Sequence, residues 1–380
     1  MFLTVYSILI SLSWIVVTVY ILLNTGKIRF LKNVAVTPGL PEPGVAVIIA
    51  AKDEQAELAA ALQTVCNLDY SNYRIFAIND RSTDNTPTIL RRLAASYPSL
   101  STITIEYLPE GWLGKNNALY QGYRASTEEW LLFTDADIHY QPQALKKAIQ
   151  YALANSLDHL TALPEITSAS SLFKSVMNTF SMMLELRLRP WDAANPSSNA
   201  SIGVGAFNLV KRAAYEKAGT HAAISLRPDD DLKLGENIKK SGLQQDVVYG
   251  EKEISLKWYN NLSEFIDGLM KNAFSISNYH FPTAIIIALL TLVVFVMPIP
   301  VLLLLGTAQR FLAILILLSQ ILLMVLKKGI RGKWWHALLI PFAGAIMIYI
   351  IVLSAYKTLK QGGIYWRGSF YPLEELKKQR

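Results

Sequence analysis

The sequence of 380 residues contains a single cysteine, Cys66. An internal disulfide and a cysteine-based metal cluster are therefore excluded, which fits a catalytic domain in the reducing cytosol. The polar part of the chain also lacks any Lys/Arg-rich run with interleaved aromatic residues, so we expect no nucleic acid partner. The formal net charge of +7 is better explained by loops beside a membrane and by contact with anionic lipid.

Apolar residues are abundant but unevenly spread. They make up 52% of the chain, and the excess lies at the N-terminus and in the last quarter. Residues 2–23 form an uncharged run long enough to cross a bilayer, and they lack the basic start and small-residue cleavage site of a signal peptide. Lys27, Arg29 and Lys32 follow, and the positive-inside rule then places the next segment in the cytoplasm.

The C-terminal apolar region predicts further membrane spans. Residues 282–326 are too long for one span, and a break near 306–310 divides them into two. Residues 336–356 predict another span, which contains Pro341. Counting spans places the tail outside, whereas its Lys and Arg residues favour the inside. A re-entrant hairpin at Pro341 would reconcile the two arguments.

These patterns predict an integral, multi-pass protein of the cell (inner) membrane with its catalytic domain in the cytoplasm. The expected divisions are a transmembrane anchor at 1–24, the catalytic domain at 45–255, an interfacial region at 256–281, about three transmembrane helices at 282–356 and a basic tail at 357–380.

Between these regions the chain alternates strand and helix patterns. Apolar runs predict strands, and helical patterns lie between or after them. We expect strands at 45–50, 74–79, 103–108, 130–134 and 206–210, and helices at 55–66, 116–125, 172–189, 232–241 and 264–275. This order predicts an α/β fold with a mainly parallel sheet flanked by helices. The helix at 172–189 is amphipathic, and we favour a place on the membrane surface over the core.

The stretch 130–137 ends in two carboxylates, Asp135 and Asp137, with one residue between them. Alternate residues of a strand share a side, so the pair can hold a Mg²⁺ or Mn²⁺ ion that clamps a diphosphate. The alternative is a turn whose Asp residues cap the next helix. Three more acidic sites fall near expected strand ends or helix starts, at 53–54, 80–84 and 229–231, and together they predict a pocket that needs a cation.

In order, the acidic set Asp53-Glu54, Asp80, Thr134-Asp135-Ala136-Asp137 and Asp230-Asp231-Leu232-Lys233-Leu234-Gly235 resembles the family 2 glycosyltransferases of GT-A fold. The likeness is to the membrane-bound branch that includes ceramide glucosyltransferases and bacterial carotenoid- and hopanoid-associated glycosyltransferases. It extends from about residue 45 to the tail and includes segments 111–115, 271–272, 366–368 and 371–373.

The resemblance implies roles for individual residues. Asp53, Glu54 and Asp80 would contact the base and ribose of a nucleotide-sugar donor, with Asp135 beside the donor and Asp137 on the metal. Lys115 would add a positive charge near the phosphates. The alternative, to which we give equal weight, is that Lys115 is a solvated surface lysine. Asp231 would be the general base, with Asp230 as the second choice.

One difference from the family pattern affects the product that we predict. Many relatives carry Gln-x-x-Arg-Trp after the base, whereas this chain reads Gly268-Leu269-Met270-Lys271-Asn272. Lys271 would replace the arginine as a diphosphate contact. We therefore predict transfer of a single hexose, from UDP-glucose in the simplest case, to a hydroxyl of a membrane lipid of ceramide, carotenoid, hopanoid or glycerolipid type. The alternatives are a polysaccharide synthase and a non-catalytic nucleotide-binding membrane scaffold.

Overall fold

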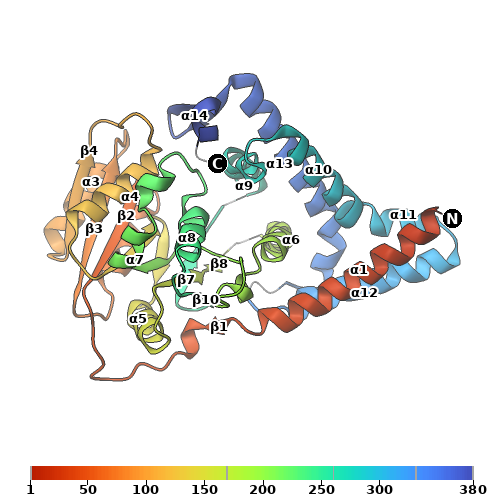
Figure 1. The fold of residues 1–380 in the computed structure, drawn as a ribbon, viewed down its shortest axis with the longest axis horizontal. Coiled ribbons are helices and arrows are strands. Elements are labelled where there is room, and N and C mark those ends of the chain that lie inside the picture. The colour runs from red at the N-terminus through yellow and green to blue at the C-terminus, as the bar shows by residue number, and fades with distance from the viewer. Residues whose placement is uncertain (1, 168–169, 260, 330–331, 379–380) are drawn as a thin grey trace.

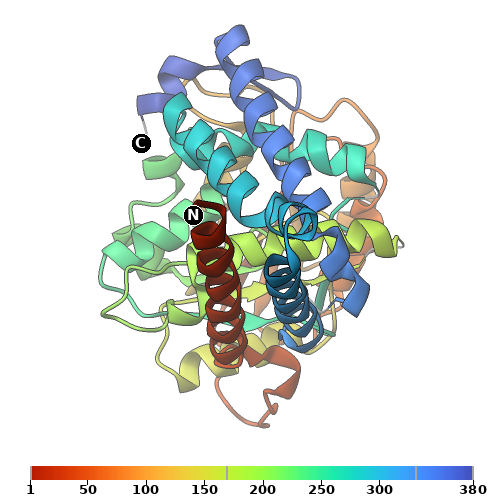
Figure 2. The ribbon, with the colours of Figure 1, turned by 90° about the vertical axis from the view of Figure 1, so that its right-hand side faces the viewer.

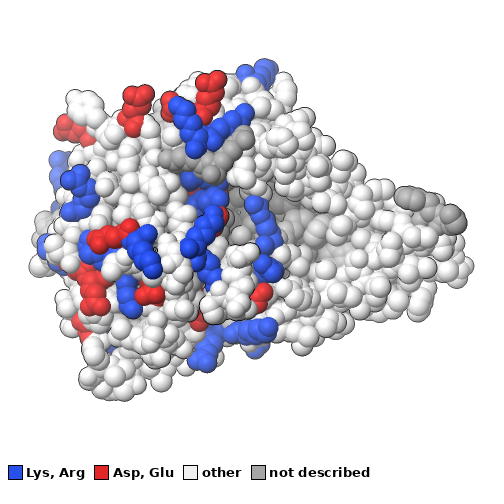
Figure 3. Space-filling model, viewed as in Figure 1, with Lys and Arg blue, Asp and Glu red and all other residues white. Residues whose placement is uncertain are grey.

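The computed structural model describes residues 2–167, 170–259, 261–329 and 332–378. An α/β part holds the central sheet, and an arm of apolar helices extends from it (Figure 1). On the face in Figure 3, the charged side chains lie on the α/β part and at its junction with the arm, whose own surface is almost free of them.

The main sheet has the strand order β1-β10-β7-β9-β5-β2-β3-β4. Neighbouring strands are parallel except around β9, which runs antiparallel to both β5 and β7. The expected mainly parallel sheet is thus confirmed. The strands are β1 Arg29–Phe30, β2 Val45–Ala51, β3 Tyr73–Asp80, β4 Leu100–Ile105, β5 Trp130–Asp135, β7 His159–Leu163, β9 Asn208–Lys211 and β10 Gln245–Tyr249. A smaller sheet pairs β6 Ile138–Tyr140, β11 Ile254–Leu256 and β8 Glu165–Ile166.

Helices cover both faces of this sheet, because alternate side chains of its buried strands point to opposite faces. In β2, Val45, Val47 and Ile49 join one apolar cluster, and Ala46 and Ile48 join another. The first cluster includes residues of α2 Leu58–Cys66, α3 Thr86–Ser96 and α5 Ala144–Ala154, and the second includes residues of α4 Gly114–Ala125, α7 Arg212–Lys217 and α8 Asp230–Lys240.

Several elements differ from the sequence-based expectation, including α2, which begins at Leu58 and not at residue 55. The strand expected at 103–108 is β4, which starts and ends three residues earlier because Leu100 pairs with Ile75 of β3. The strand expected at 206–210 is β9, which begins at Asn208. The helix expected from residue 232 is α8, whose first turn already contains Asp230 and Asp231.

The arm contains α1 Phe2–Thr25 and α12 Thr307–Leu326, which lie side by side (Figures 1 and 2). The expected break near Gly306 is confirmed, because α11 Pro298–Leu304 ends just before it. The span expected before this break is not one straight helix. It consists of α10 Phe281–Thr291, a π-helical segment Leu292–Val296 and α11. Among the described residues, three helices are long and apolar enough to cross a membrane: α1, α12 and the segment containing α13 Ile340–Gln361.

The start of α13 lies against α6, and the chain beyond its end returns to the α/β part. Before its start, His336 Nδ1 is 3.0 Å from Asn178 Nδ2 of α6 Ser171–Leu188. After its end, Arg367 contacts Glu54, which follows β2. Pro341 lies in the first turn of α13, where proline is tolerated, so the re-entrant hairpin considered there does not occur. The chain closes with the hairpin of β12 Gly363–Trp366 and β13 Ser369–Pro372, then α14 Leu373–Lys378.

Two amphipathic helices join the α/β part to α13. Side chains of α6 and α9 Leu262–Ala273 pack together with α13, through Phe173, Phe265 and Met347 among others. The proposed place of α6 on a membrane surface stays a prediction.

Candidate active site

The acidic residues converge because their strands are neighbours in the sheet. Asp80 and Asp135 are the last residues of β3 and β5, and Asp53 and Glu54 follow β2, which lies between them. The carboxyl ends of these parallel strands open on one edge, where ligands of open α/β sheets bind. The structure thus confirms that these predicted site residues share one edge.

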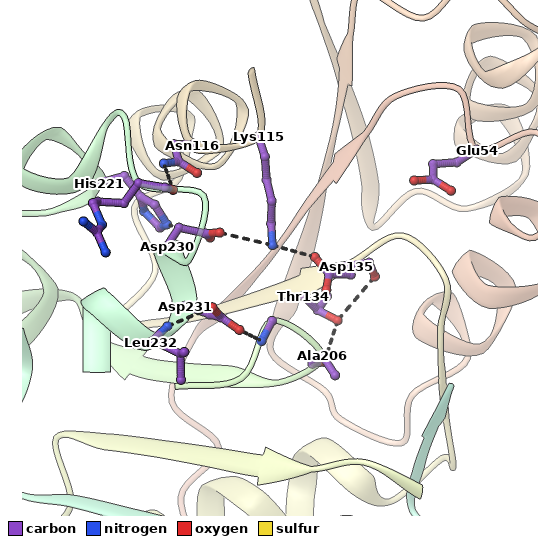
Figure 4. A network of polar contacts seen from close by, with 12 residues as sticks. Glu54, Lys115, Asn116, Thr134, Asp135, Ala206, His221, Asp230, Asp231 and Leu232 are labelled. Carbon is purple, nitrogen blue, oxygen red and sulfur yellow. Dashed lines mark hydrogen bonds and ion pairs between the residues drawn. The ribbon is translucent and has the colours of Figure 1, made fainter. Parts of the chain in front are cut away.

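Lys115 lies at the centre of the carboxylates (Figure 4). Its Nζ is 2.9 Å from Asp135 Oδ1 and 3.5 Å from Asp230 Oδ1. Burial opposes its charge, but Asp135, Asp230 and Asp231 together raise the pKa of Lys115, so it is a cation. The reading of Lys115 as a solvated surface lysine is therefore wrong.

Gly114 allows the start of α4 to approach the site closely. A Cβ at this position would lie 2.1 Å from Asp80 Oδ2. The glycine therefore brings Asp80 to the N-terminus of α4 and directs the next residue, Lys115, toward Asp135.

Asp231 is held by a glycine-rich loop. Its Oδ2 accepts a hydrogen bond of 2.8 Å from Gly205 N, and its Oδ1 accepts one of 2.8 Å from Leu232 N. A Cβ at Gly203 would lie 1.9 Å from Asp231 O, so only glycine permits this packing. Burial raises the pKa of Asp231, which brings a carboxylate closer to the range of an effective general base.

Asp230 is buried between Lys115 and His221, whose Nε2 is 3.9 Å from Asp230 Oδ2. The Tyr215 hydroxyl accepts a hydrogen bond from His221 N and lies 2.6 Å from His221 Nδ1, which fixes the orientation of the ring. Burial lowers the pKa of His221 to about 3, so the ring is neutral.

Asp137 follows Asp135 by two residues and lies near Glu54. Burial, Asp135 and Glu54, in that order, raise the pKa of Asp137 to about 7. Among the described residues, no group of three or more His, Cys, Asp and Glu side chains is arranged to hold a metal ion. The pair Asp135 and Asp137 still fits a divalent cation, because Mg²⁺ is commonly held by one or two carboxylates and the phosphates of a substrate.

The remaining residues that were predicted to bind the nucleotide sugar form a second group at the same edge. Asp53 Oδ1 accepts a hydrogen bond of 2.7 Å from Thr83 N. Asp80 binds Arg81 through both carboxylate oxygens, at 2.7 and 3.1 Å. Glu54 is paired with Arg367 at 2.5 Å. Lys271 belongs to α9, and its predicted diphosphate contact lies outside the side chains that the structure describes.

Sequence reasoning missed several residues of the site. Gly205, His221 and Arg367 contact the predicted carboxylates directly or face them. The Gly-x-Gly at 203–205 was the available signal, because paired glycines in a polar loop often mark a close backbone approach. Arg367 lies in the segment 366–368 that carries part of the family resemblance, but its contact with Glu54 had no signal, because the two residues are distant in sequence. His221 had no signal at all.

Residues 46–219 match the model of Glycosyl transferase family 2. The chain carries a family 2 glycosyltransferase domain. The match includes the strands that bear Asp80 and Asp135 and ends before the helix that bears Asp230 and Asp231.

Curated relatives match part of this chain. It is 28% identical to a beta-monoglucosyldiacylglycerol synthase of Nostoc sp. over 52% of this chain and 42% of that protein. It is 22% identical to a 4,4'-diaponeurosporenoate glycosyltransferase of Staphylococcus haemolyticus over 60% of each chain. A poly-beta-1,6-N-acetyl-D-glucosamine synthase of Staphylococcus aureus is 25% identical over 57% of this chain and 52% of that protein. The matches thus span less than two thirds of each relative.

A solved structure supports the fold. A mannosyltransferase from Pyrobaculum calidifontis in complex with GDP-Man and Mn²⁺ superposes with a TM-score of 0.55 at 17% identity, over 94% of this chain and 99% of that one. The fold is therefore GT-A, as the sequence predicted.

Proposed function

We propose that the protein is an inverting glycosyltransferase that moves one hexose from a nucleotide-diphosphate sugar, UDP-glucose in the simplest case, to a hydroxyl of a membrane lipid. The arrangement around Asp231 carries this proposal. A half-buried carboxylate with a raised pKa, fixed by Gly205 N, lies beside the Lys115–Asp135 pair at the carboxyl edge of the sheet.

The roles of the residues follow from this arrangement. Asp231 takes the proton of the acceptor hydroxyl as its oxygen bonds to the anomeric carbon, and the bond from that carbon to the diphosphate oxygen breaks. This single displacement converts an α-linked donor into a β-glycoside. Lys115 places a positive charge next to the departing diphosphate, and Asp230 keeps that lysine in position at 3.5 Å.

Asp135 and Asp137 would hold a Mg²⁺ or Mn²⁺ ion. When bound, such an ion supplies Lewis-acid stabilisation of the charge on the leaving diphosphate. Asp137 is the better placed of the two, since Asp135 is already paired with Lys115 at 2.9 Å.

The apolar arm supports a lipid acceptor. The α/β part joins helices long and apolar enough to span a membrane, and α6 and α9 lie at that junction. The names of the Nostoc and Staphylococcus haemolyticus relatives point to lipid acceptors as well. The match to the Staphylococcus aureus polysaccharide synthase keeps chain polymerisation as the second candidate.

The test uses the full chain in lipid nanodiscs with Mg²⁺ or Mn²⁺ and a panel of nucleotide sugars. Release of free nucleotide and binding of donor are measured for wild type, Asp231→Asn and the surface control Asp69→Asn. We expect Asp231→Asn to bind donor normally and to lose turnover by about 10²- to 10⁴-fold, the usual contribution of a general base. Equal turnover in Asp231→Asn and wild type would exclude this base.

The products separate the two candidate functions. Mass spectrometry of the lipid fraction is expected to show addition of one hexose. Long water-soluble polymers would instead favour the polysaccharide synthase, and donor binding without any transfer to lipid or sugar would favour a scaffold.

A further inference from the structure

The hairpin β12–β13 returns from the far end of α13 to the edge of the sheet where the donor is proposed to bind. Tyr371 of β13 is buried, and its hydroxyl accepts a hydrogen bond of 3.3 Å from Gly114 N. Ile364, Tyr371 and Leu373 share an apolar cluster with Leu113. The base of the hairpin is therefore anchored beside the residue that precedes Lys115.

The tip of this hairpin holds an arginine in an unfavourable backbone conformation. Trp366 and Ser369 close a two-residue loop, in which Arg367 has a φ of 45° and Gly368 a φ of 78°. Asn or Gly is preferred at the first of these positions. Asp53 and Arg81, at the ends of β2 and β3, also have positive φ values, of 54° and 55°. Such conformations cluster at ligand sites, where the surrounding structure maintains them.

The tip lies directly on the predicted donor residues. The Arg367 guanidinium donates to Lys52 O and to Glu54 Oε1. Ser369 Oγ is 3.5 Å from Arg81 Nη1, and Arg81 binds both oxygens of Asp80. The ends of β2 and β3 are thus joined to a segment that is more than 280 residues away in sequence.

Of Arg81, Lys115 and Arg367, Arg367 is the one best able to change partners. Its side chain is 44% exposed, compared with 22% for Arg81 and 23% for Lys115. An exposed ion pair such as Arg367–Glu54 contributes little to stability, so breaking it costs little. A guanidinium binds phosphate oxygens in a two-pronged geometry that is stronger than such a pair.

We propose that the hairpin tip is part of the donor site and that Arg367 binds the diphosphate of the nucleotide sugar, leaving Glu54 when the donor enters. This inference rests on the proposed function, because it assumes a nucleotide-diphosphate donor. It assigns the hairpin β12–β13 to the binding machinery and makes the site incomplete without it.

The test compares wild type with Arg367→Asn and Arg367→Lys in nanodiscs at fixed Mg²⁺. Asn suits the positive φ and creates a favourable Asn-Gly turn, so Arg367→Asn removes the cation without weakening the hairpin. Lys378→Asn, in α14, is the matched control for lost charge in the tail. UDP and GDP are titrated into wild type by calorimetry to find which of them binds. The affinity for that nucleoside diphosphate is then measured for each variant, and the affinity for its nucleoside is measured by competition.

We expect Arg367→Asn to weaken nucleoside diphosphate binding by about tenfold or more, the usual effect of losing a charge-assisted hydrogen bond. Nucleoside binding is expected to stay unchanged, and Arg367→Lys to recover part of the affinity. Unchanged diphosphate affinity in Arg367→Asn would overturn the inference. Tighter binding would also overturn it, because Arg367 would then be holding the site closed.

Failure of the hairpin inference and failure of the proposed function give different results. An equal loss of affinity for the diphosphate and for the nucleoside in Arg367→Asn would mean that Arg367 only shapes the site, which contradicts a phosphate contact. If wild type binds neither UDP nor GDP and releases no nucleotide from any donor, the proposed function fails and this inference with it. Normal wild-type turnover with an unaffected Arg367→Asn rejects the hairpin inference alone.

Discussion

At the scale of single residues, the main feature of the site is that several charged side chains are wholly or partly buried close together. Lys115 faces Asp135 and Asp230, and Asp231 lines the same pocket. One lysine cannot neutralise three carboxylates, and Asp137 adds a fourth. The resulting excess of negative charge raises the proton affinity of these groups, and a cation or a cationic site must offset it when the donor binds.

Replacement of Asp137 by Asn is expected to stabilise the metal-free protein at pH 8 by about 1–2 kcal/mol and to stabilise it less than half as much at pH 5. The pKa of Asp137 is raised to about 7 in the folded state, first by burial and then by Asp135 and Glu54. The folded protein therefore keeps a proton that the unfolded chain releases above about pH 4. The contribution of Asp137 to stability accordingly falls as the pH rises from about 4 to 7.

Thermal unfolding of wild type and Asp137→Asn in EDTA at both pH values measures this difference, with Asp69→Asn as the control. An effect of equal size at pH 5 and pH 8 would contradict the raised pKa.

At the scale of elements, α13 has an unusual path. It is long and apolar enough to cross a membrane, yet His336 at one end contacts α6, which joins the α/β part to α13, and Arg367 beyond the other end contacts Glu54 after β2. A helix that crossed the bilayer would have its ends on opposite sides. We infer that α13 lies along the membrane on the side of the catalytic domain. The basic residues before and after it are then on one side, as the positive-inside rule favours.

Single cysteines test the path of α13. We expect cysteines introduced for Lys27, Lys328 and Lys360 to react with a membrane-impermeant maleimide from one side, and Ala308→Cys to react from the other. The native Cys66 is buried, and burial raises the pKa of its thiol to about 11, so it does not interfere. Labelling of Lys360→Cys from the same side as Ala308→Cys would show that α13 crosses the membrane.

At the scale of the whole molecule, a buried ion pair fastens the arm to the α/β part. Lys327, at the end of α12, places Nζ 2.7 and 2.8 Å from the two carboxylate oxygens of Glu185 in α6. Both side chains are almost fully buried. Removing one member leaves an uncompensated buried charge, whereas removing both does not.

Lys327→Met and Glu185→Met are each expected to lower the free energy of unfolding by about 3–5 kcal/mol. The double variant Lys327→Met/Glu185→Met is expected to lose less than either single variant. Thermal unfolding in nanodiscs measures these changes, and Lys240→Met, which removes an exposed ion pair with Glu236, serves as the control. Additive losses in the double variant would show that the two residues do not act as a pair.

Several features of the fold could be predicted because they depend on local pattern. The buried run at 45–50 identified β2, and the break near Gly306 separated two apolar helices. Predictions failed where pairing or helix capping decided the outcome. Leu100 pairs with Ile75, which shifts β4, and Asp230 and Asp231 enter the first turn of α8 because carboxylates are favoured there.

The sequence by itself determined the GT-A fold and the acidic residues of the site, because residue order places each carboxylate at the end of a strand or the start of a helix. Tertiary structure alone decided how their charges are shared. Lys115, Gly205 and Arg367 reach these carboxylates from three separate elements. Contacts between such distant segments depend on the packing of helices on the sheet and on the return of the chain after α13, and no local pattern encodes either.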